Sequence, residues 1–234
     1  MRKVKMNIPD RGDYQLKEGL NQLKTNVAFC GEGIKVISIT SSVMNEGKSS
    51  VAFSLAKTLA ADGKKTLLVD ADLRKSTLVA KYHIEGIEKG FSHYLTGQAG
   101  TEDIIYATEY EDFYLTVAGP LVPDPIRLLN SDLFSAFMEQ IKEKFDYVIV
   151  DTPPLGLVVD AVIIGQHTDG TIIVIEQGVI KRKILQDVVK QLRTGNVQIL
   201  GAVLNKVDQA SGGYYKYSYY SEGYSHGKHK KKQK

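Results

Sequence analysis

The 234-residue sequence has one cysteine, Cys30, and no long apolar run. A lone cysteine cannot form an intramolecular disulfide, which fits a reducing compartment, and we expect it to be a small buried or half-buried residue. The longest apolar stretches, 147–150 and 170–175, are far shorter than the roughly 20 residues of a membrane-spanning helix. Residues 1–5 are not followed by the apolar run of a signal peptide. We therefore expect a cytoplasmic protein that reaches the inner face of a membrane through a partner or through charge.

The last 26 residues, 209–234, contain no Leu, Ile, Val, Phe or Met. This segment cannot bury enough aliphatic surface to offset its ordering entropy, so we expect it to be disordered. Six lysines and one glutamate give it a charge of +5, whereas residues 1–208 carry 24 basic and 26 acidic side chains. A body without excess positive charge argues against a nucleic-acid-binding protein. Six of the 13 tyrosines lie in this tail: Tyr214, Tyr215, Tyr217, Tyr219, Tyr220 and Tyr224.

Residues 31–208 alternate between apolar strands and helices. Continuous apolar runs predict strands, and apolar residues at helical spacing predict helices between them. This alternation is typical of an α/β fold with a mostly parallel sheet covered on both faces by helices. A further helix over Tyr14–Phe29 precedes this pattern and is expected to pack as an appendage or to meet another chain. The predicted strands are 36–40, Thr66–Asp70, Tyr147–Asp151, Gly170–Glu176 and Ile199–Asn205, and the helices are 49–61, 131–144 and 181–192.

A phosphate-binding loop is predicted between the first of these strands and its helix. The segment 41–50 reads SSVMNEGKSS, which is the Walker A pattern with Ser42 in place of its first glycine. Backbone N–H groups of such a loop and the N-terminus of the following helix bind phosphate oxygens. Lys48 would bridge the β- and γ-phosphates, and the Ser49 hydroxyl would bind Mg²⁺. The ATP-binding residues expected here are Val43, Met44, Asn45, Glu46, Gly47, Lys48, Ser49 and Ser50.

Carboxylates end two of the predicted strands. Asp151 occupies the Walker B place, and Asp70 and Asp72 form a second pair two residues apart. Ligands of parallel sheets bind at the carboxyl ends of the strands, where two carboxylates can divide the work of holding Mg²⁺ and orienting a nucleophile. The alternative is that each acid only caps a helix or forms a turn. For Asp160, which precedes an apolar run, a helix N-cap is the favoured interpretation.

Taken together, these motifs resemble the bacterial tyrosine kinases (BY-kinases), P-loop kinases of capsule and exopolysaccharide assembly. The resemblance covers nearly the whole chain. It rests on the loop 41–50, the Asp-x-Asp-x-Arg motif 70–74, the segments 150–154, 90–97 and 119–125, Leu204-Asn205 and the terminal tyrosines.

The resemblance implies an ATP-dependent protein-tyrosine kinase that autophosphorylates its terminal tyrosines, mainly in trans, and regulates capsular or exopolysaccharide synthesis and export. It implies that Lys48 and Ser49 hold ATP and Mg²⁺, that Asp72 and Asp151 serve the metal, and that Asn205 contacts the adenine. Asp70 would be the base that accepts the tyrosine proton. The implied partners are a membrane-anchored activator, further copies of the chain, tyrosine-containing substrates and a phosphatase.

The expected organisation has three parts. Residues 1–30 form an N-terminal segment with the oligomerisation helix, 31–208 the P-loop kinase domain, and 209–234 the autophosphorylation tail. Asn21 and Lys24 replace two arginines that are usual in that helix of the family, and Met44 replaces a proline of the loop.

Three alternatives remain at this point. A partition- or septum-type switch ATPase shares this branch of the fold, but its signature lysine would stand at Val43. A non-enzymatic regulator would not need the intact set Lys48, Ser49, Asp70, Asp72 and Asp151. A tail of Tyr, Gly and Lys can also stack on RNA bases.

Overall fold

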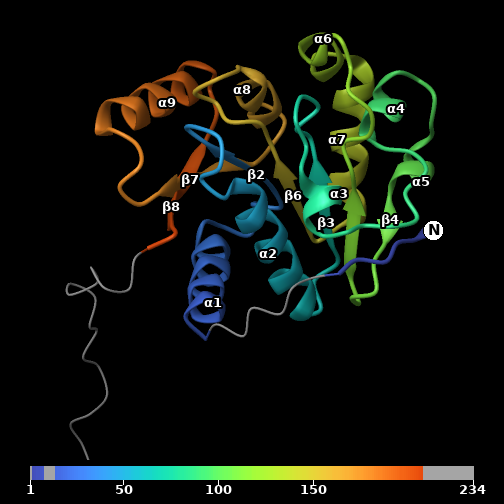
Figure 1. Cartoon of the computed structure of the whole chain (residues 1–234), viewed down its shortest axis with the longest axis horizontal. Coiled ribbons are helices and arrows are strands. Elements are labelled where there is room, and N and C mark those ends of the chain that lie inside the picture. The colour runs from blue at the N-terminus through green and yellow to red at the C-terminus, as the bar shows by residue number, and fades with distance from the viewer. Residues whose placement is uncertain (1, 8–13, 208–234) are drawn as a thin grey trace, which may run out of the picture.

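The computed structural model describes residues 2–7 and 14–207, so the predictions for the tail lie outside the described residues. In this part of the chain eight strands form one sheet in the order β1-β4-β5-β3-β6-β2-β7-β8 (Figure 1). All neighbouring strands pair in parallel except the antiparallel pair β4–β5. The strands are β1 (Arg2–Lys3), β2 (Val36–Ser41), β3 (Thr66–Asp70), β4 (Tyr106–Ala107), β5 (Phe113–Thr116), β6 (Tyr147–Asp151), β7 (Gly170–Glu176) and β8 (Ile199–Asn205).

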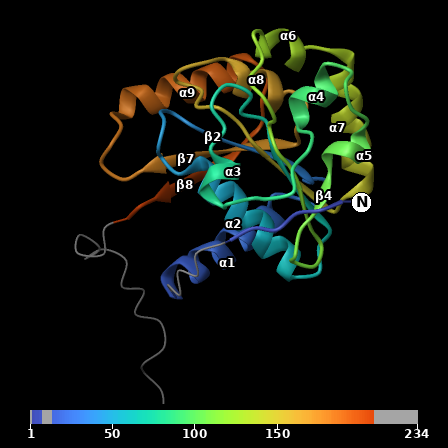
Figure 2. The same ribbon diagram turned by 45° about the vertical axis from the view of Figure 1, so that its right-hand side comes forward.

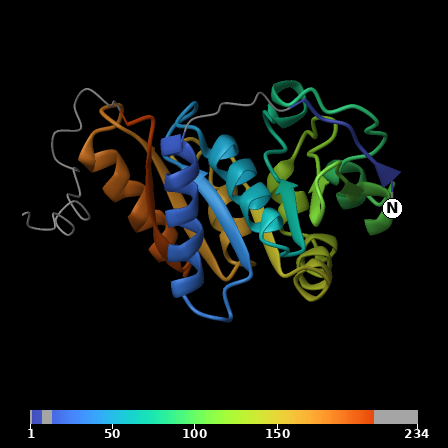
Figure 3. The same ribbon diagram turned by 90° about the horizontal axis from the view of Figure 1, so that it is seen from below.

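Helices cover both faces of this sheet. The helices α1 and α2 lie on the side opposite α8 and α9 in Figures 1 and 2, and α1 and α2 lie in front of the strands in Figure 3. The prediction of a mostly parallel sheet covered on both faces is therefore confirmed. The helices are α1 (Tyr14–Phe29), α2 (Lys48–Ala61), α3 (Leu78–Lys81), α4 (Phe91–Leu95), α5 (Thr101–Ile104), α6 (Pro125–Leu129), α7 (Asp132–Lys144), α8 (Asp160–Gly165) and α9 (Arg182–Thr194).

The two-sided covering follows from the apolar strands. Successive side chains of a strand point to opposite faces, so a strand that is apolar throughout needs a cover on each side. In β3, Leu68 joins the core beneath α1 and α2, whereas Leu67 and Val69 join the core beneath α4 and α7. All three are fully buried. The alternation of strand and helix in the sequence is thus the direct cause of the three-layer architecture.

The helix α1 packs against α2, as an appendage to the central unit. Val27 is buried and Leu23 packs against the same core, while Tyr14 and Phe29 remain largely exposed. Lys24 forms an ion pair with Asp62, just beyond the end of α2. The expectation that Cys30 is at least half buried is wrong, because this residue lies just after the end of α1 and is exposed. None of the helices in the described ranges is long and apolar enough to cross a membrane.

The strand order brings together loops that are far apart in the sequence. The strand β6 lies between β3 and β2, and its last residue, Asp151, pairs in register with Asp70 of β3 and with Ile39 of β2. The loop that follows β2 leads directly into α2. The ends of three strands therefore meet at one edge of the sheet, where the polar side chains of the site lie.

Candidate functional site

The loop between β2 and α2 has a compact, internally bonded shape. Its residues Asn45 and Gly47 both adopt positive φ, 68° and 95°. The Glu46 side chain is fully buried, and its Oε2 accepts hydrogen bonds from the backbone N–H groups of Ser42 at 2.7 Å and Val43 at 2.8 Å. The carboxylate of Glu46 therefore holds the beginning of the loop and does not face the place where an anion would bind.

The end of β8 holds the loop from the outside. Asn205 donates a hydrogen bond from Nδ2 to the backbone carbonyl of Glu46 at 2.9 Å. The next residue, Lys206, donates from Nζ to the carbonyl of Asn45 at 2.7 Å and pairs with Glu176 at 2.8 Å. Two consecutive residues at the last strand of the sheet thus bind two consecutive carbonyls of the loop.

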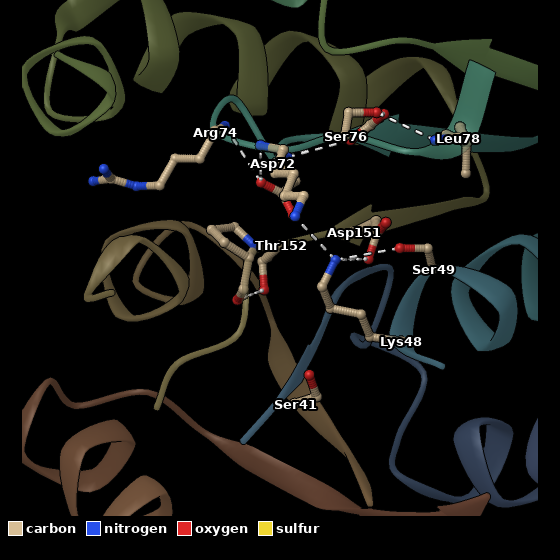
Figure 4. A network of polar contacts seen from close by, with 12 residues as sticks. Ser41, Lys48, Ser49, Asp72, Arg74, Ser76, Leu78, Asp151 and Thr152 are labelled. Carbon is tan, nitrogen blue, oxygen red and sulfur yellow. Dashed lines mark hydrogen bonds and ion pairs between the residues drawn. The ribbon is translucent and has the colours of Figure 1, made fainter. Parts of the chain in front are cut away.

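Lys48 is the first residue of α2, and its ammonium lies between two carboxylates (Figure 4). Its Nζ is 3.3 Å from Oδ2 of Asp72 and 3.5 Å from Oδ1 of Asp151, and it contacts the Ser49 hydroxyl at 3.2 Å. Burial lowers the pKa of Lys48, but the neighbouring carboxylates of Asp151 and Asp72 outweigh it and raise that pKa. Lys48 is therefore a fixed positive charge at the N-terminus of a helix, where phosphate groups bind.

Asp70 ends β3 and is completely buried. Its Oδ2 accepts a hydrogen bond from the Ser76 hydroxyl, and its Oδ1 accepts one from the backbone N–H of Asp72 at 3.3 Å. Burial and the nearby charges of Asp151 and Asp72 raise the pKa of Asp70 to about 7, against the lowering effect of Ser76. A carboxylate whose pKa is raised by its surroundings can accept a proton at neutral pH.

Asp72 and Asp151 present carboxylate oxygens toward Lys48. Oδ1 of Asp72 accepts hydrogen bonds from the backbone N–H groups of Arg74 at 3.3 Å and Lys75 at 3.0 Å. Oδ1 of Asp151 is buried and receives no hydrogen bond from the described residues. Burial raises the pKa of Asp151, and the charge of Lys48 opposes this rise. This Oδ1 faces the Lys48 ammonium at 3.5 Å, and a buried carboxylate stabilises such a positive charge.

The structure brings six of the predicted site residues to one edge of the sheet: Lys48, Ser49, Asp70, Asp72 and Asp151 form one cluster, and Asn205 lies across the loop from it. Of the other loop residues, Met44 and Asn45 are exposed, whereas Val43 and Ser50 are partly buried. Ser50 contacts Lys81 of α3. The six tail tyrosines lie outside the described residues.

The interpretation of Asp160 as a helix N-cap is wrong. Val159 holds the N-cap position of α8, and Asp160 is its first helical residue with a fully buried side chain. Its two carboxylate oxygens accept hydrogen bonds from Nε and Nη2 of Arg74, at 2.8 and 2.9 Å. A buried charge requires a partner more strongly than a helix end requires a cap. The Asp-x-Asp-x-Arg motif draws attention to Arg74 but does not indicate that its partner is Asp160.

The fold and the site define a P-loop nucleoside triphosphate-binding protein. A family model described as an AAA domain matches residues 34–200. The septum site-determining protein MinD from Pyrococcus horikoshii, solved with Mg-ADP, superposes with a TM-score of 0.62 at 26% identity, over 73% of this chain and 70% of that chain. The fold is thus similar to that of a septum site-determining protein whose structure contains Mg-ADP.

Other similarities are specific to kinases. Tyrosine-protein kinase CpsD of Streptococcus agalactiae is 40% identical over 206 residues, which cover 88% of this chain and 90% of CpsD. The kinase domain of the Escherichia coli tyrosine kinase ETK superposes with a TM-score of 0.83 at 29% identity, over 93% of this chain and 86% of that domain. The chain belongs to the bacterial tyrosine kinase family, and it is a tyrosine-protein kinase.

Proposed function

We propose that this kinase transfers the γ-phosphoryl group of ATP to tyrosines of its own tail, residues 209–234, mainly between copies of the chain. The observation that carries the proposal is the position of Lys48 between Asp72 and Asp151, beside the buried carboxylate of Asp70. Within this proposal, 31–208 is the kinase domain, 1–30 is the oligomerisation segment, and the tail supplies the acceptors Tyr214, Tyr215, Tyr217, Tyr219, Tyr220 and Tyr224.

The residues of the site fit Mg²⁺ together with a nucleotide. No group of three or more His, Cys, Asp or Glu side chains in the described ranges forms a metal cage. Mg²⁺ bound with a nucleotide needs only one or two carboxylates, because substrate phosphates and waters complete its shell. Asp151, whose buried Oδ1 is ion-paired with Lys48 but accepts no hydrogen bond within the described residues, and Asp72 would hold the ion, together with the Ser49 hydroxyl. When bound, Mg²⁺ neutralises charge on the phosphate oxygens.

The chain's own residues would divide the remaining work. Lys48 binds the β- and γ-phosphates, and the backbone of residues 43–50 surrounds them. Asn205 contacts the adenine. The tyrosine oxygen attacks the γ-phosphorus, its proton passes to the carboxylate of Asp70, and the bond between the γ-phosphorus and the β-phosphate oxygen breaks to release ADP. A tyrosine hydroxyl is protonated at neutral pH, so it must give up its proton as it attacks. Asp70, with a pKa of about 7, suits the role of acceptor because an efficient general base has a pKa near the working pH.

The tail suits the role of acceptor in two respects. When copies of the chain are assembled, a tethered segment raises the effective concentration of its tyrosines at a neighbouring site to roughly the mM range. Its charge of +5 is attracted to a site that contains carboxylates and would contain ATP. In this function the kinase is cytoplasmic, works with a membrane-anchored activator at the inner face of the membrane, and regulates capsular or exopolysaccharide synthesis and export. A phosphatase would reverse the modification.

Mass spectrometry of tail peptides after incubation with Mg-ATP tests the proposal. Each modified tyrosine adds about 80 Da, and the Lys48→Met variant is expected to show no addition. Lys57→Met is the matched control, because Lys57 also lies on α2 but contacts the ring of Tyr110, and it should label like wild type. Release of inorganic phosphate by a wild-type protein whose tail stays unmodified would instead indicate a switch ATPase.

A further inference from the structure

Arg74 and Asp160 connect two parts of the chain that carry the site carboxylates. Arg74 follows β3 by four residues and closes the segment that contains Asp70 and Asp72. Asp160 begins α8, at the end of the segment that follows Asp151 and β6. The strands β3 and β6 are neighbours in the sheet, so these two segments leave the same edge side by side. A contact that joins these two segments therefore helps to fix the distance between Asp72 and Asp151.

The link itself is a two-pronged ion pair. Nε and Nη2 of Arg74 donate to the two different oxygens of Asp160, and such a planar pair fixes orientation as well as distance. The Asp160 side chain has no exposed surface, whereas that of Arg74 is 34% exposed. Asp160 therefore cannot exchange this partner for water without a large rearrangement of α8.

Arg74 holds Asp72 with its backbone at the same time. Its N–H donates to Oδ1 of Asp72 at 3.3 Å, and Oδ2 of Asp72 faces Lys48. In Figure 4 the Arg74 side chain points away from Lys48. One residue thus binds the site carboxylate with its main chain and the first turn of α8 with its side chain.

The segment before α8 is fixed just as firmly at its other end. The backbone N–H of Thr152 donates to the carbonyl of Ile39 at 3.1 Å, and that of Leu155 donates to the carbonyl of Ser41 at 2.9 Å. Residues 152–160 are therefore attached to β2 and the start of the phosphate loop on one side and to Arg74 on the other. Hydrogen bonds therefore connect all the segments that surround Asp72, Asp151 and Lys48.

We propose that Arg74 and Asp160 are a positioning pair for phosphoryl transfer, which sets the arrangement of Asp72 and Asp151 that receives Mg²⁺ with the nucleotide. The inference deepens the proposed function, because it concerns the same site. Neither side chain touches the reacting atoms. The pair acts through the backbone N–H of Arg74 on Asp72 and through the 152–160 segment on Asp151.

Two conservative variants test the pair in the full-length chain. Arg74→Lys keeps the charge but loses the two-pronged geometry, and Asp160→Asn keeps the shape but loses the charge. The experiment would measure the affinity of each variant for the fluorescent nucleotide mant-ADP, once with Mg²⁺ and once with EDTA. It would also measure kcat for tail phosphorylation. Both variants are expected to keep the affinity in EDTA within about threefold, to lose most of the gain that Mg²⁺ gives, and to lower kcat at least about tenfold.

The double variant and a distant ion pair supply the controls. If the two residues act as a unit, the double variant should be no worse than Asp160→Asn alone. Asp103→Asn removes the same charge from the exposed pair of Asp103 with Lys89 and should change neither readout. The proposal would be overturned if Mg²⁺ increased the mant-ADP affinity of both variants as much as it does for wild type. It would also be overturned if the variants lost affinity equally with and without Mg²⁺. A different result would contradict the proposed autophosphorylation itself, namely a wild-type tail that stays unlabelled.

Discussion

The side-chain amide of Asn205 hydrogen-bonds to the backbone carbonyl of Glu46 across 2.9 Å, which joins the last strand of the sheet to the phosphate loop. Because these residues are 159 positions apart, the loop is shaped by a partner that its own motif does not contain.

Asn205→Ala is expected to weaken ATP binding more than catalysis. Loss of one such hydrogen bond costs about 1 kcal/mol, which predicts a roughly fivefold higher KM for ATP with kcat within about twofold. Steady-state kinetics at saturating Mg²⁺ would measure both. Asn130→Ala removes a comparable amide–carbonyl bond, to Ile126 on α6, and should leave KM unchanged. A kcat effect larger than the KM effect would contradict this expectation.

Gly47→Ala should disturb the loop beyond the cost of its backbone conformation. Gly47 has φ of +95°, and a Cβ there would lie 2.1 Å from Nδ2 of Asn205. Gly63 has φ of +73° with nothing within 4 Å of an added Cβ, so Gly63→Ala isolates the backbone term of about 1–2 kcal/mol. Urea denaturation should show this loss in both variants. Only Gly47→Ala should also raise the KM for ATP, and an equal KM in the two variants would argue against the contact.

Asp70→Asn should stabilise the metal-free protein at alkaline pH and abolish kinase activity. The pKa of Asp70 is about 7 in the folded protein, against 3.8 for an aspartate side chain free in water. The folded protein therefore binds more protons between these values, and its stability falls as the pH rises through them. The variant lacks this penalty, which is about 1.4 kcal/mol for each unit of pKa difference.

Thermal unfolding in EDTA would measure this effect. The Tm of Asp70→Asn should exceed that of wild type by several degrees at pH 8 and by little at pH 4. Asp187→Asn, which changes an exposed aspartate of α9, serves as the control, and its Tm should stay close to that of wild type at pH 8. Equal Tm values of Asp70→Asn and wild type at pH 8 would show that the burial of this carboxylate costs nothing.

Transfer between chains predicts a simple mixing result. A Lys48→Met chain with an intact tail cannot phosphorylate itself, and an active chain ending at residue 208 has no tail to accept phosphate. Incubated together with Mg-ATP, they should yield phosphate on the tail of the Lys48→Met chain. An unlabelled tail in this mixture, alongside self-labelling of wild type, would mean transfer within one chain.

The sequence predicted most of the central architecture. The strands Thr66–Asp70, Tyr147–Asp151, Gly170–Glu176 and Ile199–Asn205 have the predicted bounds, because each is a continuous apolar run between polar segments. Ser131, predicted as the start of a helix, is the N-cap of α7 and accepts a hydrogen bond from the N–H of Phe134. The strands β1 and β4 were not predicted, since two residues carry no periodicity, and the four-residue strand β5 was not predicted either.

The site was predicted less completely, because the pair formed by Arg74 and Asp160 was missed. A local pattern can indicate that an acid before an apolar run caps a helix, as was inferred for Asp160. It does not show that this carboxylate is buried, or that both of its oxygens bind an arginine that lies 86 positions earlier in the sequence. Buried charge is paired wherever the fold allows, and that choice depends on tertiary packing.

The covered parallel sheet, the phosphate-binding loop and the kinds of side chain at the strand ends follow from local patterns of residue type, so the sequence alone predicts them. Which strand ends meet depends on how the chain folds. The tertiary structure places β6 between β3 and β2, sets Asp151 beside Asp70 and Lys48, and raises the pKa of Asp70 by burial among like charges. Strand order and burial arise from contacts between distant segments, and only the folded chain contains them.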